Sequence, residues 1–217
     1  MTPLRRAALA LALAVACLAV TRPATAAAPL DQLKMQIDRV LKVVDDPELR
    51  KEGKVKERRA AVRKIANDIF DFGETARRSL GRHWLARTPT EQAEFVELFS
   101  DLLERSYLSK IELYGGEKIQ YISDTTDDAG QAKVLTKIVT RQGTEIPIEY
   151  RMHKKGERWL VYDVIIESVS LVSNYRTQFN RIMRTGSYDE LVRRMKASQS
   201  DFNAPGGSTG KSATPRS

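Results

Sequence analysis

Residues in the second half of the chain alternate between apolar and polar side chains, and only a few residues separate one alternating segment from the next. Segments 134–140 and 146–152 place apolar or β-branched residues at every second position, as β-strands with one buried face do. Two flanking segments, 118–123 and 158–168, raise the count to four. Connections this short predict an antiparallel meander. The segment 158–168 is apolar on both faces, so we expect it to be more buried than the segment 146–152.

Helical spacing precedes and follows these strands. Apolar residues recur at helical intervals over 33–44, 55–70, 95–111 and 172–183, and again after Ser187. Thr88-Pro89-Thr90-Glu91 has the pattern of a capping box and predicts the start of a long helix that runs to about Tyr114. The sequence therefore predicts an α+β fold, with N-terminal helices, a four-stranded curled antiparallel sheet and C-terminal helices. In such a fold helices cover one face of the sheet.

The two ends of the chain differ in composition from the part between them. Residues 1–28 combine a basic start, an apolar run from Ala7 to Val20 and small residues around Ala26, which predicts a signal peptide and export to the bacterial periplasm. Residues 29–200 fit one domain. Residues 201–217 are rich in Gly, Ser, Thr and Pro and are expected to form a flexible tail.

The single cysteine, Cys17, lies inside the apolar run of the expected signal peptide. Its surroundings loosely resemble a lipobox, but Ala14 occupies the place where a lipobox prefers Leu, and apolar residues continue beyond the cysteine. We therefore expect Cys17 to be removed with the signal peptide rather than to anchor a lipoprotein. The mature chain then has no thiol for disulfides, catalysis or metal binding.

The charge of the chain is moderately basic. It holds 36 Lys and Arg against 28 Asp and Glu, a net charge of +8, which becomes +5 (33 − 28) without residues 1–28. Basic and acidic residues are interleaved along most of the chain, whereas nucleic-acid binders usually concentrate Lys and Arg on one face or arm. The sequence therefore argues against a nucleic-acid partner.

Few residues could carry out catalysis. His83 and His153 are the only histidines and lack metal-ligand spacing, and neither a P-loop nor a GxSxG motif is present. Asp163 lies in an apolar strand, where a carboxylate must be paired or neutralised. We expect it to be a structural anchor that holds its strand against a helix through an Arg, a Tyr hydroxyl or backbone N–H groups. No catalytic residue, metal or cofactor is predicted, and the sequence favours a binding protein over an enzyme.

The segment 159–170, WLVYDVIIESVS, resembles the signature of the MlaC family. Asn174, Arg184-Thr185-Gly186 and the helix start at Tyr188 extend this resemblance, as do 72–84 and 88–107, so that it covers about residues 30–198. One departure is Ser168, where the family often has Gly. The members are periplasmic phospholipid-binding proteins, also known as toluene-tolerance auxiliary components of an ABC transporter.

The resemblance implies a lipid shuttle with no enzymatic activity. Its implied ligand is a phospholipid, and its implied partners are an outer-membrane lipoprotein complex and the MCE-domain subunit of an inner-membrane ABC transporter, with transient proximity to the membranes. The implied role is to maintain the lipid asymmetry of the outer membrane. Two alternatives stay open. A branch of the family accompanies hopanoid lipids, and the +5 charge with Lys211 and Arg216 would also suit an interaction module without lipid.

The pocket that the resemblance implies lies between the curled sheet and the helices. Burial of acyl chains contributes about 0.8 kcal/mol per methylene, so its lining should be apolar. The residues with a suitable period are Val134, Ile138, Ile146, Ile148, Tyr150 and Val161 on the strands and Leu98, Leu102 and Tyr107 on the long helix.

Overall fold

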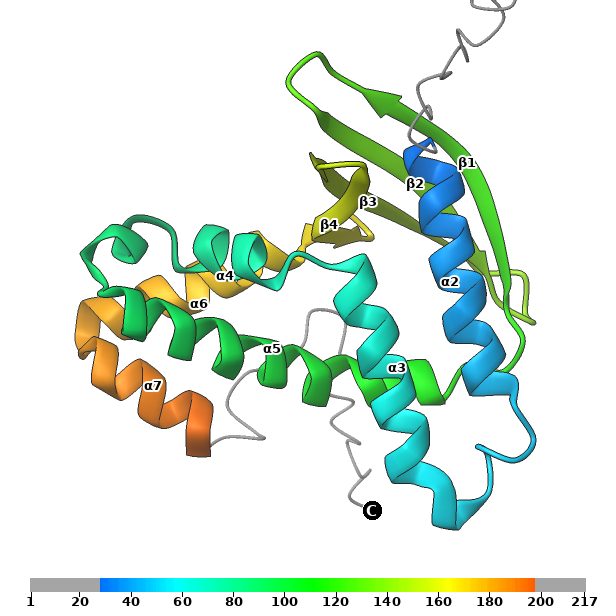
Figure 1. Ribbon diagram of the computed structural model, residues 1–217, viewed down its shortest axis with the longest axis horizontal. Helices are drawn as coiled ribbons and strands as arrows, with labels where there is room; N and C mark the ends of the chain where they lie inside the picture. The colour runs from blue at the N-terminus through cyan, green and yellow to red at the C-terminus, as the bar shows by residue number, and fades with distance from the viewer. Residues whose placement is uncertain (1–27, 198–217) are drawn as a thin grey trace, which may run out of the picture.

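The computed structural model describes residues 28–197, which form six α-helices, two short 3-10 helices and one antiparallel sheet (Figure 1). The helical elements are α2 (Pro29–Asp45), η1 (Glu52–Lys54), α3 (Val55–Ile69), α4 (Phe72–Leu80), η2 (Gly81–Ala86), α5 (Pro89–Glu112), α6 (Leu171–Thr185) and α7 (Tyr188–Ala197). The strands are β1 (Lys118–Thr126), β2 (Gln131–Val139), β3 (Glu145–Lys155), β4 (Arg158–Ile166) and β5 (Val169–Ser170). The expected signal peptide with Cys17 and the expected tail lie almost wholly outside the described residues.

The strands follow one another across the sheet in the order β1-β2-β3-β4-β5, and every neighbouring pair is antiparallel. The predicted α+β meander is therefore confirmed, with a corrected strand count of five instead of four. Strand β4 ends at Ile166 because Glu167 and Ser168 adopt positive φ angles of 48° and 70°, which reverse the chain into β5. Two residues are too few to show a period of their own, so the sequence could not reveal β5.

The predicted helices are present, and the capping box at the start of α5 is formed. The Glu91 N–H donates to Thr88 Oγ1 (3.2 Å), while the Thr88 N–H donates to Glu91 Oε2 (2.7 Å). Helix α5 ends at Glu112 rather than at about Tyr114. Helix α4 was not predicted; Asp71 caps its N-terminus by accepting a bond from the Glu74 N–H (3.0 Å).

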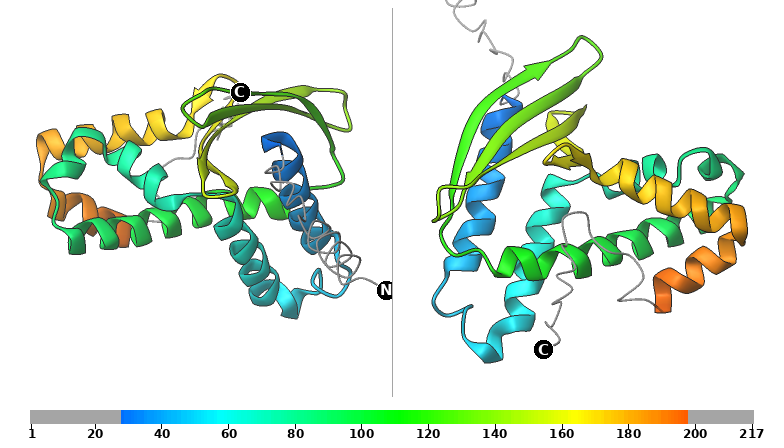
Figure 2. Two further views of the ribbon diagram at one scale, coloured as in Figure 1. Left: turned by 45° about the horizontal axis from the view of Figure 1, so that its top comes forward. Right: turned by 180° about the vertical axis from the view of Figure 1, so that it is seen from behind.

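The molecule has two halves, each with its own apolar core. In the sheet half the sheet curls around α2 (Figure 2), and α2, α3 and the inner sheet face share a cluster of buried residues, here called the sheet core. In the helical half α4, α5, α6 and α7 enclose a second cluster, the helical core. The sheet core consists of Leu33, Ile65, Ile69, Ala132, Val134, Met152, Trp159 and Val161. Helices α4 and α6 contact β4, whereas α5 has no extensive contact with a strand among the described elements.

The two halves meet at β4, and also where Leu108 of α5 packs with Val44 and Val62 in a third, smaller cluster. Phe70 and Val161 form an isolated parallel bridge, and the Asp71 N–H donates to the Val161 carbonyl (2.9 Å). Thr75 Oγ1 donates to the Tyr162 carbonyl (3.1 Å). Backbone and side-chain hydrogen bonds thus fix the ends of α3 and α4 to β4. None of the helices within residues 28–197 is both long enough and apolar enough to cross a membrane.

Candidate functional site

The inner face of the sheet collects the apolar residues that the sequence assigned to a pocket. Residues directly opposite each other in a sheet share a face, as do alternate residues along a strand. Val134 is paired with Tyr150, and Ile138 with Ile146. Ile148 lies two residues from both Ile146 and Tyr150, so it shares their face. Val161 is paired with Met152 and joins the same face beyond a bulge in the β3–β4 register. The register therefore brings all six predicted strand residues together on the face that holds α2.

These six residues fall into two groups that differ in what covers them. Val134 and Val161 are fully buried in the sheet core beneath α2 and α3, and half-buried Tyr150 packs against that core. Farther along the strands, Ile138 and Ile146 are half-buried and Ile148 is 7% exposed, yet none of the three joins a core cluster among the described residues.

Two further isoleucines complete this second group. Ile119 of β1 is paired with Ile138, and Ile166 of β4 is paired with Ile148, so both lie on the same face. Both are half-buried and likewise join no core cluster. We call the five residues Ile119, Ile138, Ile146, Ile148 and Ile166 the isoleucine patch. Alternation within one strand does not reveal its register against the next strand, and without the register Ile119 and Ile166 could not be assigned to this face.

Tyr121 is a polar residue beside the isoleucine patch. It is paired with Thr136 next to Ile148, and its buried hydroxyl has no hydrogen-bond partner among the described residues. Burial raises the pKa of Tyr121, and the nearby carboxylate of Asp38 adds to this effect. The ammonium of Lys34 lies 5.6 Å from the ring centroid. A buried polar group without a hydrogen-bond partner costs about 1–3 kcal/mol. A ligand oxygen that reached this hydroxyl would accept its hydrogen bond and remove that cost.

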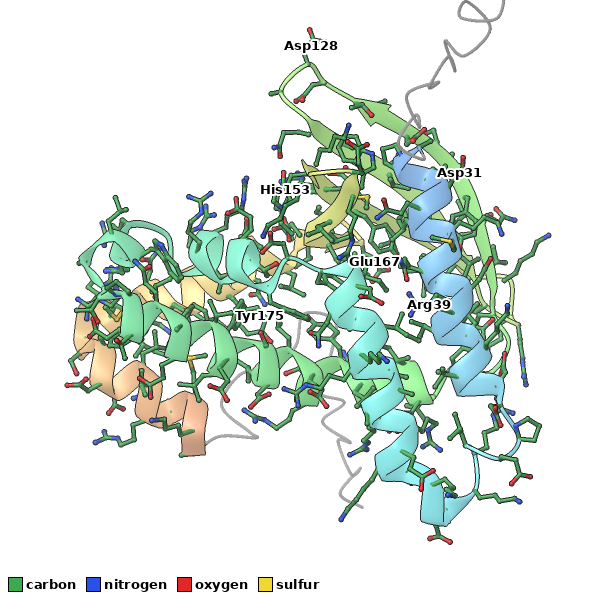
Figure 3. All side chains as sticks on the ribbon, in the orientation of Figure 1. Asp31, Arg39, Asp128, His153, Glu167 and Tyr175 are labelled. Atoms are coloured by element: carbon green, nitrogen blue, oxygen red, sulfur yellow. The ribbon has the colours of Figure 1, made fainter. Side chains whose placement is uncertain are left out.

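The three helix residues assigned to the pocket lie in the other half. Leu102 is buried in the helical core, and half-buried Leu98 and Tyr107 pack against that core. The Tyr107 hydroxyl is buried without a hydrogen-bond partner in the described part of the chain, and burial raises its pKa, followed by the effect of Tyr175. Tyr175 lies in the helical half (Figure 3). The structure therefore does not join the helix residues and the strand residues in one cluster.

Asp163 lies at the contact between the halves and is 4% exposed. Its carboxylate accepts bonds from the Val172 N–H (3.0 Å) and the Ser170 hydroxyl (2.7 Å), and Arg151 Nη1 lies 3.9 Å away. The expected anchor between a strand and a helix is confirmed, with a backbone N–H and an Arg among its partners. The Ser170 hydroxyl was not foreseen; it also caps α6 by accepting a bond from the Ser173 N–H (3.0 Å).

The two histidines have separate partners. His83 Nε2 lies 2.9 Å from Asn180 Oδ1, and His153 Nε2 lies 3.2 Å from Asp71 Oδ2. No group of three or more His, Cys, Asp or Glu side chains within residues 28–197 is arranged to hold a metal ion. The polar residues that the sequence singled out therefore connect elements to one another.

Fold and site together define an α+β domain with an open, curled sheet whose inner face is only partly covered by its own helices. The MlaC protein family matches residues 34–197, and the chain belongs to this family. The match includes all nine residues that the sequence assigned to the pocket.

Two curated relatives and one solved structure resemble the chain. The intermembrane phospholipid transport system binding protein MlaC of Haemophilus influenzae is 22% identical over 143 residues, which cover 63% of this chain and 67% of the relative. The toluene tolerance protein ttg2D of Pseudomonas putida is 26% identical over 102 residues, 47% of each chain. A phospholipid-binding protein from Ralstonia solanacearum, solved in complex with a phospholipid, is 26% identical with a TM-score of 0.68, covering 77% of this chain and 94% of that one.

Proposed function

We propose that this protein binds a phospholipid in the periplasm and carries it between the outer membrane and an inner-membrane ABC transporter with an MCE-domain subunit. The observation that carries the proposal is the similarity in fold to a protein that holds a phospholipid, over 94% of that protein's length. Membership of the MlaC family and the signal peptide expected at residues 1–28 support the compartment. An outer-membrane lipoprotein complex is the proposed partner at the other membrane.

We place the acyl chains on the isoleucine patch. Its five side chains are contiguous in the register, are apolar and are left out of the core clusters of the described residues. Each buried methylene contributes about 0.8 kcal/mol, so two long chains provide most of the binding free energy. Of the remaining predicted residues, Val134, Tyr150 and Val161 lie at the closed end of this site, whereas Leu98, Leu102 and Tyr107 pack in the helical core and lie outside the site proposed here.

The Tyr121 hydroxyl is the proposed polar contact of the lipid. It is a phenol that has no hydrogen-bond partner among the described residues and lies two residues from Ile119 on β1, so it can donate a hydrogen bond to an ester carbonyl or phosphate oxygen. Replacement Tyr121→Phe removes only this donor. We expect it to weaken phospholipid binding by about tenfold, the equivalent of about 1.4 kcal/mol, while the acyl contacts are retained.

The test begins with the full chain purified from the periplasm after export. Native mass spectrometry should show a bound species, and its solvent extract should contain glycerophospholipid. A hopanoid in the extract would favour the alternative cargo, and protein without lipid across several preparations would contradict lipid carriage.

A pair of variants on the two faces of β2 tests where the lipid lies. Ile138→Asn places an amide in the isoleucine patch and should lower the lipid-to-protein ratio severalfold. Leu135→Asn is the matched control, because Leu135 lies on the opposite face and is 40% exposed. Equal lipid content in both variants, with both folded, would exclude the patch as the acyl-chain site.

A further inference from the structure

Two segments of the chain contain several arginines and no carboxylate. Residues 75–90 hold Arg77, Arg78, Arg82 and Arg87, and residues 168–188 hold Arg176, Arg181 and Arg184. Neither segment contains an Asp or a Glu, whereas basic and acidic residues are interleaved over most of the chain. The positive charge is therefore concentrated in two places that are about 90 residues apart in sequence.

The fold brings these two segments together at the end of the helical half. His83 on η2 is hydrogen-bonded to Asn180 on α6 (2.9 Å), and Arg176 Nε donates to the Arg78 carbonyl (2.8 Å). A Cβ on Gly81 would lie 3.5 Å from the Arg176 side chain. The end of α6 and the turn between α4 and α5 lie on the side of the molecule away from the sheet (Figures 1 and 2).

Carboxylates neutralise only three of the seven arginines. Glu74 pairs with Arg77 and Arg78, and Glu91 pairs with Arg87 (3.2 Å). The other four, Arg82, Arg176, Arg181 and Arg184, are exposed and form no salt bridge within residues 28–197. The next carboxylates along the chain are Asp189 and Glu190 at the start of α7, and Glu190 is already paired with Arg193 and Arg194.

An exposed leucine accompanies the four arginines. Leu85 on η2 is 90% exposed, more than any other large apolar side chain among the described residues. Its neighbour Trp84 packs against the helical core, with its ring 6.5 Å from the Phe95 ring, so the turn that presents Leu85 is held in place. We call Arg82, Leu85, Arg176, Arg181 and Arg184 the arginine end.

We propose that the arginine end docks the protein on a bilayer surface that contains anionic phospholipid. Guanidinium groups pair with phosphate oxygens in a bidentate manner, and clusters of basic side chains bind membranes that contain anionic lipids. A single apolar side chain beside them matches the boundary between headgroups and acyl chains. A stable protein partner would instead need a broad patch with an apolar centre, and one leucine among arginines does not provide this.

The arginine end and the proposed lipid site consist of different residues. The idea that a lipid carrier uses this surface to dock rests on the proposed function. None of its five residues belongs to the isoleucine patch, and η2 and α6 lie in the other half of the molecule. A change at the arginine end can therefore alter membrane docking without altering the lipid that the protein holds.

Sedimentation with vesicles tests this proposal. Vesicles of phosphatidylethanolamine and phosphatidylglycerol at about three to one provide the anionic surface, and pure phosphatidylcholine vesicles provide the neutral one. We expect binding to the anionic vesicles at low salt, weaker binding at about 0.5 M salt and little binding to the neutral vesicles. Absence of binding to anionic vesicles at low salt would overturn the proposal. It would also be overturned if the arginine end bound an acidic protein but not the anionic vesicles.

A charge-matched pair of triple variants locates the surface. Arg82→Gln, Arg181→Gln and Arg184→Gln together should weaken binding to the anionic vesicles by about a hundredfold, since each basic residue at the surface contributes about fivefold. Lys118→Gln, Lys133→Gln and Lys154→Gln remove the same charge from exposed positions on the strands and should have little effect. If both triple variants lost vesicle binding equally, binding would depend only on the net charge of the protein, and the arginine end would not be the docking surface.

The apolar contact has its own matched pair. Leu85→Ser should weaken vesicle binding severalfold at every salt concentration, whereas Leu113→Ser, at a residue that is 81% exposed after α5, should not. The lipid content of the arginine variant should equal that of the unmodified protein. If the arginine variant loses vesicle binding but keeps its lipid, the docking proposal is supported independently of the lipid site. If no preparation of the unmodified protein contains lipid but the protein still binds vesicles, only the proposed function fails.

Discussion

The helical half and the sheet half bury their apolar side chains in different ways. In the helical core, Phe99 packs against Phe95, Tyr175 and Phe179 with ring centroids 5.0–5.9 Å apart, and all four residues are at most 1% exposed. In the sheet half, the residues beneath α2 and α3 are buried, whereas four of the five residues of the isoleucine patch are only half-buried and none joins a core cluster of the described residues. The comparison suggests that one half supplies stability and the other retains apolar surface for a ligand.

The largest effect is expected in the helical core. Phe99→Ala should lower the free energy of unfolding by about 3–5 kcal/mol, because it removes a fully buried ring and leaves a cavity. Urea denaturation of protein from which lipid has been extracted measures this loss. The loss should be similar in lipid-loaded protein, since Phe99 lies away from the proposed site.

Ile138→Ala is the comparison variant in the isoleucine patch. It should cost only about 1 kcal/mol in the lipid-free protein, because the side chain is half-buried, and more in the lipid-loaded protein, because ligand binding adds to stability. If the loss in free energy of unfolding changed equally with lipid in Phe99→Ala and Ile138→Ala, the division between a stabilising half and a binding half would be wrong.

The next effect concerns the contact between the halves. Asp163→Asn should lower the free energy of unfolding by about 2 kcal/mol, because an amide keeps one acceptor but leaves the Val172 N–H or the Ser170 hydroxyl without its charged partner. Asp128→Asn, at the exposed β1–β2 turn (Figure 3), is the control and should be neutral. An unchanged melting temperature with loss of lipid transfer would contradict a structural role for Asp163.

Period and capping chemistry were sufficient to predict most of the fold. The alternation in 146–152 and the pattern Thr88-Pro89-Thr90-Glu91 depend on neighbours in sequence, so they could be read without the structure. Helix α4 was missed although Asp71 and Glu74 have the spacing of a cap, because its nine residues include Gly73 and too few large apolar residues to show a helical period. The patch was only partly predicted because Ile119 and Ile166 join it through pairing between strands.

A size change in the isoleucine patch sharpens the comparison further. Ile148→Trp should leave the protein folded while the indole occupies the space of the acyl chains, so the bound phospholipid should be lost. Over a solid core the added volume would instead cost about 1–3 kcal/mol. Ile148 is 7% exposed but joins none of the core clusters of the described residues, which favours the first outcome. The measurement combines the melting temperature with the lipid-to-protein ratio, and a folded variant with undiminished lipid would remove Ile148 from the site.

The smallest effect is electrostatic and lies where the halves meet. Burial raises the pKa of Asp71, but the hydrogen bond from the Glu74 N–H and the ammonium of Lys155 offset this, and His153 also faces the carboxylate, so its pKa lies below the ordinary value of 3.8. A depressed pKa in the folded state means that the charge stabilises the protein above the unfolded pKa, and that this contribution is lost as pH falls through the folded value.

Asp71→Asn isolates this contribution, because Asn is also a good N-cap. The unmodified protein should be more stable than the variant at pH 5, and the difference should shrink as the pH falls below about 4. The effect should be small because Lys155 is exposed, so salt screens the pair. Denaturation of both proteins between pH 5 and pH 3 measures the difference, and a difference that stayed constant over this range would mean that the charge of Asp71 does not help to hold the two halves together.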